Sequence, residues 1–369
     1  MARNRGYGSY RGRASFTDIL KWIAVALAIL ILAAIGLLVW GQQYLVSTDK
    51  GIQFRPPFLE FFHPASSSED VSNDFSIIVD TSGSQSQSQT PDPEPEPEPE
   101  PVLTAAAAAL EAAADGSALQ QVAQAGGNAI ILEMKSPQGR LAWQTENSMA
   151  VQAGAVSSDN IDAQLEALGQ GETPLIALFD CFQDHALAAS ESYAILSNSG
   201  YKWTDPDKVR WSSPTNPLVQ DYQVSLMVEL AELGFDEIVL QNWGYPDEGN
   251  LNWIRVGEAY DPNQLDQIVE SFLAKARRAL EPYGVKLSVM VSPAVLSGEN
   301  LLSGQTGAAI DRWTDRVWVR PNSPEDDLDA LLTQAGITNS QERLVRIADT
   351  LDLTSERPQA ALTPVGPAG

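Results

Sequence analysis

The chain has 369 residues and carries 48 Asp and Glu against 23 Lys and Arg, a formal net charge of −25. An acidic body repels nucleic acid and anionic surfaces, so we exclude nucleic acid as a partner and expect a neutral or cationic one. The single cysteine, Cys181, excludes an intrachain disulfide, and the two histidines, His63 and His185, are too few for a histidine-rich metal site. We therefore predict neither a metal site nor a cofactor.

The charge is unevenly distributed along the chain. The first 40 residues hold five basic residues and one acidic residue, and the other 18 basic and 47 acidic residues give the remainder a formal charge of −29. Residues 23–39, between Trp22 and Trp40, are apolar and uncharged, close to the roughly 20 residues that a spanning helix needs. No A-x-A cleavage pattern follows, so we predict a transmembrane signal anchor over residues 22–42.

The basic residues before this anchor set its orientation. By the positive-inside rule, residues 1–21 form a cytoplasmic tail and the C-terminal part of this single-pass membrane protein lies outside the cell. The sequence gives no clear assignment for the juxtamembrane segment 43–81. Residues 82–101 are rich first in Ser and Gln and then in alternating Pro and Glu, which favours an extended, acidic linker.

The folded domain is expected over residues 102–353, where apolar strand-like runs alternate with helical stretches. A weak first strand at 102–104 is followed by an alanine-rich helical stretch, and residues 354–369 are expected to form a disordered tail. The remaining expected strands are 128–135, 174–182, 235–240, 286–292, 316–319 and 344–348.

Repeated strand-then-helix order predicts a parallel sheet with helices outside it. Over about 250 residues the usual closed form is a (β/α)8 TIM-like barrel. Because the sequence shows seven strands, an irregular or incomplete barrel is a second interpretation. A doubly wound sheet has less support, since no glycine-rich phosphate loop follows any strand.

One segment, residues 234–246, joins a helix end, a strand that is apolar on both faces and a loop of amide and aromatic residues. In parallel sheets ligands bind at the carboxyl ends of the strands. We therefore expect Gln241, Asn242, Trp243 and Tyr245 to bind substrate, with Gln241 and Trp243 on one face of the strand.

This segment resembles the glycoside hydrolase family of unknown function DUF4015, whose members carry a strand ending of the form GFDEIxFDYxRFP. The matching residues are Gly234, Phe235, Asp236, Glu237, Ile238 and Pro246. Two differences concern the chemistry, because Gln241 stands where the family has Asp and Gly244 where it has Arg. On the strand near 290 the resemblance places a second family Asp at Met290.

The resemblance implies glycoside hydrolysis, which ordinarily needs two carboxyl groups, about 5 to 9.5 Å apart depending on the stereochemical outcome. An amide or a thioether cannot replace either one. Glu133 and Lys135 do match the family, as do Phe182 and Asp184. We therefore name Glu133 with Asp184 as a relocated catalytic pair, and we expect Asp180 to share a strand face with Asp184 and to bind substrate.

Aromatic residues match the family better than the acids do. Trp211, with Pro214 and Tyr222, resembles a WxDP...Y element, although Ser213 replaces its Asp. Flat rings beside hydrogen-bonding amides are typical of a sugar site, so Trp211 joins the expected substrate-binding residues. Rings such as Trp203 and Trp253 fit this role and a core role equally well.

Three functional hypotheses follow. The first is a membrane-anchored, extracellular glycoside-hydrolase-like barrel that has lost its acids and binds a polysaccharide or cell-wall glycan. The second is an active hydrolase with a relocated carboxylate pair. The third is a protein-binding scaffold of the cell envelope.

Overall fold

The computed structural model describes residues 45–48, 51–54 and 101–365, in two units divided near residue 93. In the first unit, β1 (Leu45–Thr48) pairs antiparallel with β2 (Gly51–Phe54), within the juxtamembrane segment that the sequence left unassigned. The expected cytoplasmic tail, the anchor at 22–42 and residues 82–100 of the linker lie outside the described residues. Within the described ranges, no helix is long and apolar enough to cross a membrane.

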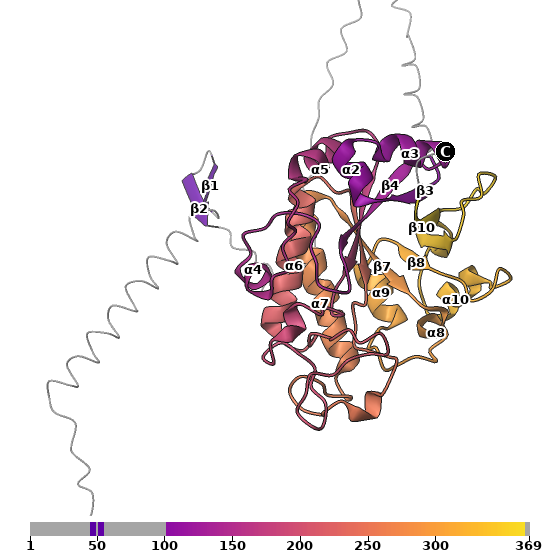
Figure 1. Ribbon diagram of the computed structural model, residues 1–369. Helices are drawn as coiled ribbons and strands as arrows, with labels where there is room; N and C mark the ends of the chain where they lie inside the picture. The colour runs from indigo at the N-terminus through magenta and orange to yellow at the C-terminus, as the bar shows by residue number, and fades with distance from the viewer. Residues whose placement is uncertain (1–44, 49–50, 55–100, 366–369) are drawn as a thin grey trace, which may run out of the picture. The chain divides into compact units, whose positions relative to one another are not determined.

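The second unit is a closed barrel of eight parallel strands with helices around it (Figure 1), which confirms the (β/α)8 prediction. Each strand pairs with its neighbours in chain order, and the last strand closes the barrel against the first. The strands are β3 (Thr104–Ala108), β4 (Ala129–Lys135), β5 (Leu175–Asp180), β6 (Glu237–Gln241), β7 (Lys286–Val291), β8 (Val317–Val319), β9 (Leu344–Ala348) and β10 (Gln359–Val365).

Ten α-helices and three short 3-10 helices connect these strands in the described part of the chain. They are α2 (Leu110–Asp115), α3 (Ala118–Gln124), α4 (Ser148–Ala153), α5 (Asp162–Gly169), η3 (Leu187–Ala189), α6 (Pro217–Glu232), η4 (Leu251–Trp253), α7 (Leu265–Leu280), η5 (Glu281–Tyr283), α8 (Pro293–Leu296), α9 (Gly307–Trp313), α10 (Leu328–Gln334) and α11 (Ser340–Arg343).

The longest helices, α6 and α7, pack side by side against the barrel (Figure 1). Asn216 begins α6 by accepting a hydrogen bond from the backbone N–H of Leu218, and Pro217 occupies the first turn, where its missing N–H costs nothing. In α7 the buried residues recur every three to four positions, including Val269, Phe272 and Ala276. This spacing gives α7 one apolar face toward the sheet.

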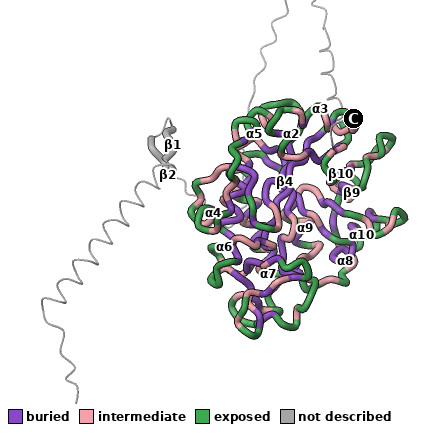
Figure 2. Tube along the Cα trace, in the orientation of Figure 1, coloured by how far each residue is buried: buried purple, intermediate pink, exposed green. Residues whose placement is uncertain are grey.

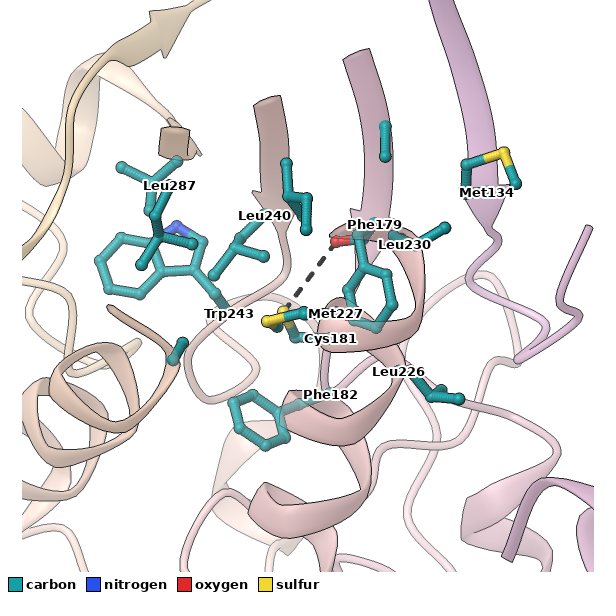
Figure 3. Close-up of a cluster of buried hydrophobic side chains, with 14 of the residues drawn as sticks. Met134, Phe179, Cys181, Phe182, Leu226, Met227, Leu230, Leu240, Trp243 and Leu287 are labelled. Atoms are coloured by element: carbon teal, nitrogen blue, oxygen red, sulfur yellow. Dashed lines mark hydrogen bonds between the residues drawn. The ribbon is translucent and has the colours of Figure 1, made fainter. Parts of the chain in front are cut away.

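The barrel has two apolar layers, and the buried residues follow its strands (Figure 2). The inner layer is built from alternate strand residues, most of them small or β-branched, and Trp318 is its largest side chain. The outer layer lies between strands and helices, where Phe179, Met227 and Leu240 gather (Figure 3). Since side chains alternate along a strand, the inner layer identifies which strand-end residues point into the barrel mouth.

The seam between β3 and β10 corrects two sequence predictions. Residues 104–108, four of them alanine, form a strand and not the expected helix, and residues 359–365 form the eighth strand and not a disordered tail. Ala105 and Ala106 pair with Ala360 and Ala361. Alanine favours helices in isolation, but here strand pairing and burial decide the conformation.

Several residues that match the family build the opposite, amino-terminal end of the barrel. The Glu237 carboxylate accepts hydrogen bonds from Arg316, at 2.6 Å, and from the indole of Trp318, at 2.9 Å. Asp236 accepts a hydrogen bond from the backbone N–H of Leu175. Gly234 has a φ of +92° and lies against Gly169, where a Cβ would approach to 3.0 Å. These matched residues therefore specify the fold, not the chemistry.

Candidate functional site

The mouth of the barrel is formed by the residues at the carboxyl ends of the strands. Ile131 on β4, Leu178 on β5 and Val239 on β6 belong to the inner layer. Side chains alternate along a strand, so the residues two positions further on point to the same side: Glu133, Asp180 and Gln241. Glu133 is exposed, Gln241 is half-buried and Asp180 is only 1% exposed. The sequence thus brings an exposed acid, a buried acid and an amide to the same end of the barrel.

A central cavity of about 460 Å³ opens at this mouth. The Gln241 side chain donates to the sulfur of Met290 at 3.6 Å, and both residues line the cavity, as the sequence predicted for Gln241. The lining also includes Trp211, Asn242, Tyr245, Asp247, Val291, Ser292, Pro293, Ser303, Gln305, Arg320, Pro321 and Asn322.

Asn242 changes the direction of the chain after β6. Its φ is +45°, in the left-handed region that Asn tolerates better than most residues. The side-chain amide donates to the carboxylate of Asp180 and, at 2.8 Å, to the side-chain oxygen of Gln183. Asn242 therefore lines the cavity and connects the ends of β5 and β6.

This change of direction corrects the prediction for Trp243. Strand alternation ends at Gln241, so Trp243 does not share its face; it is fully buried in the outer layer beside Leu240 and Leu287 (Figure 3). Its indole N–H donates to the backbone oxygen of Met290 at 3.0 Å. Trp243 thus stabilises the barrel and cannot contact a ligand at the mouth.

The two other aromatic candidates do reach the cavity. Trp211 is 5% exposed, and its indole N–H donates to Asp205 at 2.9 Å, which fixes the ring. The Tyr245 hydroxyl bonds to Thr215, and its ring packs edge-on against Tyr260 with centroids 5.5 Å apart. Burial raises the pKa of Tyr245 to about 12, so the hydroxyl stays protonated at neutral pH.

Gly244 has a steric reason to be glycine. A Cβ at this position would lie 2.3 Å from the backbone oxygen of Ser303, and the N–H of Tyr245 donates to that same oxygen at 2.8 Å. The loop carrying Ser303 and Gln305 therefore occupies the space beside Gly244. The arginine that the family resemblance implies there would need this loop to move.

Asp180 is a buried acid with an unusual proton affinity. Burial raises the pKa of its carboxyl to about 7, although the hydrogen bond from Asn242 and the charge of Lys135 oppose the shift. Its Oδ2 has no hydrogen-bond partner among the described residues. Glu133 pairs with Leu178, two residues before Asp180, so strand geometry puts the Cα atoms of the two acids roughly 8 Å apart.

Asp184, the second member of the expected catalytic pair, is placed differently from the prediction. Strand β5 ends at Asp180, so the two do not share a strand face. The Asp184 carboxylate lies 2.8 Å from Lys135 Nζ, with both side chains fully buried, and it accepts a hydrogen bond from the backbone N–H of Leu187. The structure brings Glu133 and Asp180, not Glu133 and Asp184, to the mouth.

Several lining residues were not predicted from the sequence. Arg320 directly follows β8 and Asn322 lies two residues further on, so the strand-end rule that selected Gln241 also points to this segment. Ser303 and Gln305 come from a loop that begins well after β7, and no local pattern assigns them to the mouth. Asp247 follows the matched segment by one residue and supplies the one carboxylate in the described lining of the central cavity.

The fold and the mouth together define a (β/α)8 barrel with a polar cavity at the carboxyl ends of its strands. Residues 102–318 match the family DUF4015, described as "Putative glycosyl hydrolase domain", and the chain belongs to this family. No curated protein matches the sequence.

Several solved structures are similar to this chain. A hypothetical protein from Ruminiclostridium thermocellum is 24% identical, over 50% of this chain and 95% of that one, with a TM-score of 0.43. The glycoside hydrolase domain of PgaB from Bordetella bronchiseptica is 12% identical, over 70% of this chain and 94% of that one, with a TM-score of 0.46. The glycoside hydrolase domain of PelA from Pseudomonas aeruginosa is 14% identical, over 66% of this chain and 83% of that one, with a TM-score of 0.39.

Proposed function

We propose that this barrel binds a polysaccharide or cell-wall glycan at its mouth and does not hydrolyse it. The observation that carries the proposal is the contact between Gln241 and Met290 in the central cavity. These are the two positions where the family resemblance implies carboxylates. An amide can bind a sugar hydroxyl, but neither an amide nor a thioether can protonate a leaving group or activate water.

The rest of the lining suits a sugar. Amide side chains of Asn242, Gln305 and Asn322 offer donors and acceptors for hydroxyl groups, beside the rings of Trp211 and Tyr245. Asp247 faces the cavity without a second lining acid, and its carboxylate accepts a hydrogen bond from Asn300. One carboxylate does not provide the pair that glycoside hydrolysis ordinarily uses.

A second candidate function, hydrolysis by a relocated pair, is favoured by Asp180. A carboxyl with a pKa of about 7 can act as a general acid near neutral pH, and exposed Glu133 points into the same mouth. Against this function, neither acid belongs to the lining of the central cavity. If hydrolysis occurs, Glu133→Gln and Asp180→Asn should each abolish it.

The membrane anchor belongs to the proposal and rests on the sequence. An anchor at 22–42 behind a basic tail, followed by a Pro/Glu linker, would hold the barrel away from the outer face of the membrane. Protease added to intact cells should digest the barrel and leave residues 1–21 protected. Protection of the barrel would contradict this orientation.

Retention on insoluble glycans tests the binding function. The purified full chain is mixed with chitin, cellulose or peptidoglycan and sedimented; we expect wild type to sediment with at least one of them and Gln241→Ala to remain in the supernatant. Gln267→Ala, an exposed position on α7, is the matched control and should sediment like wild type. Equal retention of Gln241→Ala and wild type would contradict the proposal.

A further inference from the structure

Two further cavities adjoin the central one along the rim of the barrel. The first, of about 220 Å³, shares Trp211, Asn242 and Asp247 with the central cavity and is otherwise lined by the loops after β5 and β6. The second, of about 500 Å³, shares Arg320, Pro321 and Asn322 with it and lies over the ends of β8 and β9.

The three cavities form a row and not a cluster. The two outer cavities have no lining residue in common, whereas each shares three with the central cavity. The row therefore runs across the mouth from the β5–β6 loops, over the ends of β6 and β7, to the loops after β8 and β9. The central cavity alone is the size of a small-molecule site, so the row has room for more than one or two sugars.

The charges along the row restrict its ligand. The cavity at the β5–β6 end has four carboxylates and no cationic residue in its lining, and the exposed Asp207 and Glu248 make no ion pair with another described residue. At the other end, Arg320 pairs with Asp349 at 2.8 Å, and Arg346 donates to the backbone oxygen of Pro324 without a carboxylate partner among the described residues, so this end has one uncompensated positive charge. Over the three linings together, five carboxylates stand against two arginines, so a chain with acidic groups along its length would meet net repulsion.

We propose that these cavities act as one groove that binds an internal stretch of a linear glycan without acidic groups, rather than a sugar at a chain end. This inference rests on the proposed function and specifies its ligand. Gln241, at the centre, contacts every bound oligosaccharide, whereas Glu248 and Arg346, at the two ends, contact only a ligand long enough to reach them.

Calorimetric titration of the full chain with N-acetylglucosamine oligomers of two to six sugars tests the length of the groove. These neutral oligomers differ only in length. We expect affinity to increase at least tenfold from dimer to hexamer, and an oligogalacturonate hexamer, which is anionic, to bind at least tenfold more weakly than the neutral hexamer. An affinity that does not increase beyond the dimer, or equal binding of the anionic hexamer, would overturn the inference.

Variants at the centre and the ends separate this inference from the function on which it rests. Glu248→Ala and Arg346→Ala should each weaken hexamer binding about three- to tenfold and leave dimer binding unchanged, because neither residue lines the central cavity. Gln241→Ala should weaken both, and Glu166→Gln, an exposed acid on α5 outside the three linings, should weaken neither. If Gln241→Ala weakens binding while both end variants bind hexamer like wild type, the groove is wrong and the mouth site stands. If Gln241→Ala changes nothing, the proposed function itself fails.

Discussion

Lys135 Nζ lies 2.8 Å from Oδ2 of Asp184, and both side chains are fully buried between the ends of β4 and β5. Lys135 also donates to the backbone oxygen of Asp180 at 2.7 Å and lies over the Phe179 ring. Gly139, where a Cβ would come within 2.1 Å of the Asp184 carboxylate, lets the loop after β4 close over the pair. This arrangement gives two family-matched residues a structural role.

Removing one partner of this pair should destabilise the barrel strongly. Lys135→Met leaves the Asp184 carboxylate buried without its cation, so we expect a loss of about 3 to 5 kcal/mol in the free energy of unfolding, measured by urea denaturation. The double variant Lys135→Met with Asp184→Asn buries no uncompensated charge and should lose less than the sum of the two single variants. Additive losses would show that the pair is not coupled.

The pKa of Asp180 predicts how stability depends on pH. The folded state binds the proton of the Asp180 carboxyl more tightly than the unfolded chain does. Protonated Asp180 therefore stabilises the fold fully below about pH 4, and this stabilisation is lost as pH rises through about 7. Asparagine at this position stays neutral, so in Asp180→Asn the free energy of unfolding should fall less steeply between pH 4 and 8 than in wild type. If the free energy of unfolding of the variant depends on pH as steeply as that of wild type, the raised pKa of Asp180 is contradicted.

Gly244→Ala should destabilise the mouth. The added Cβ would lie 2.3 Å from the Ser303 backbone oxygen, so the loop must shift, at about 1 to 3 kcal/mol, and glycan retention should fall with it. Gly257→Ala is the matched control, because nothing lies within 4 Å of a Cβ there. If thermal unfolding shows equal losses for the two variants, close approach to Ser303 is not the cause.

Trp243→Ala should act through stability and not through ligand contact. Deleting this fully buried ring leaves a cavity in the outer layer and should cost about 3 to 5 kcal/mol in unfolding free energy. Under conditions where the variant remains folded, shown by its circular dichroism, its glycan affinity should equal that of wild type. A normal unfolding free energy with reduced affinity would show that the ring contacts ligand after all.

The sequence predicted the strands that are rich in branched apolar residues, because their patterns differ clearly from those of helices and loops. It predicted a weak strand at 102–104, of which only Thr104 belongs to β3, and it did not predict β10. Alanine runs resemble helices, and Pro364, which breaks the strand pattern, lies where the pairing register with β3 is irregular. Those strands form because the barrel must close, and no local signal contains that information.

Within the site, the strand-end rule pointed to Gln241 and the family resemblance pointed to Met290, and both residues line the central cavity. Alternation is reliable up to the last paired residue of a strand. The strand-end rule was wrong for Trp243, because the left-handed backbone at Asn242 reverses the alternation. It was wrong for Asp184 because β5 ends at Asp180 and the chain then turns toward Lys135. Loop residues such as Ser303 reach the cavity through tertiary packing alone.

Release of new reducing ends from a glycan that the full chain retains is the most direct test of the central claim, because it separates binding from hydrolysis in one sample. The account predicts retention with no release above background at any pH from 4 to 8, since Gln241 and Met290 provide no ionisable oxygen. Release that disappears in both Glu133→Gln and Asp180→Asn would show instead that the barrel is an active hydrolase with relocated acids.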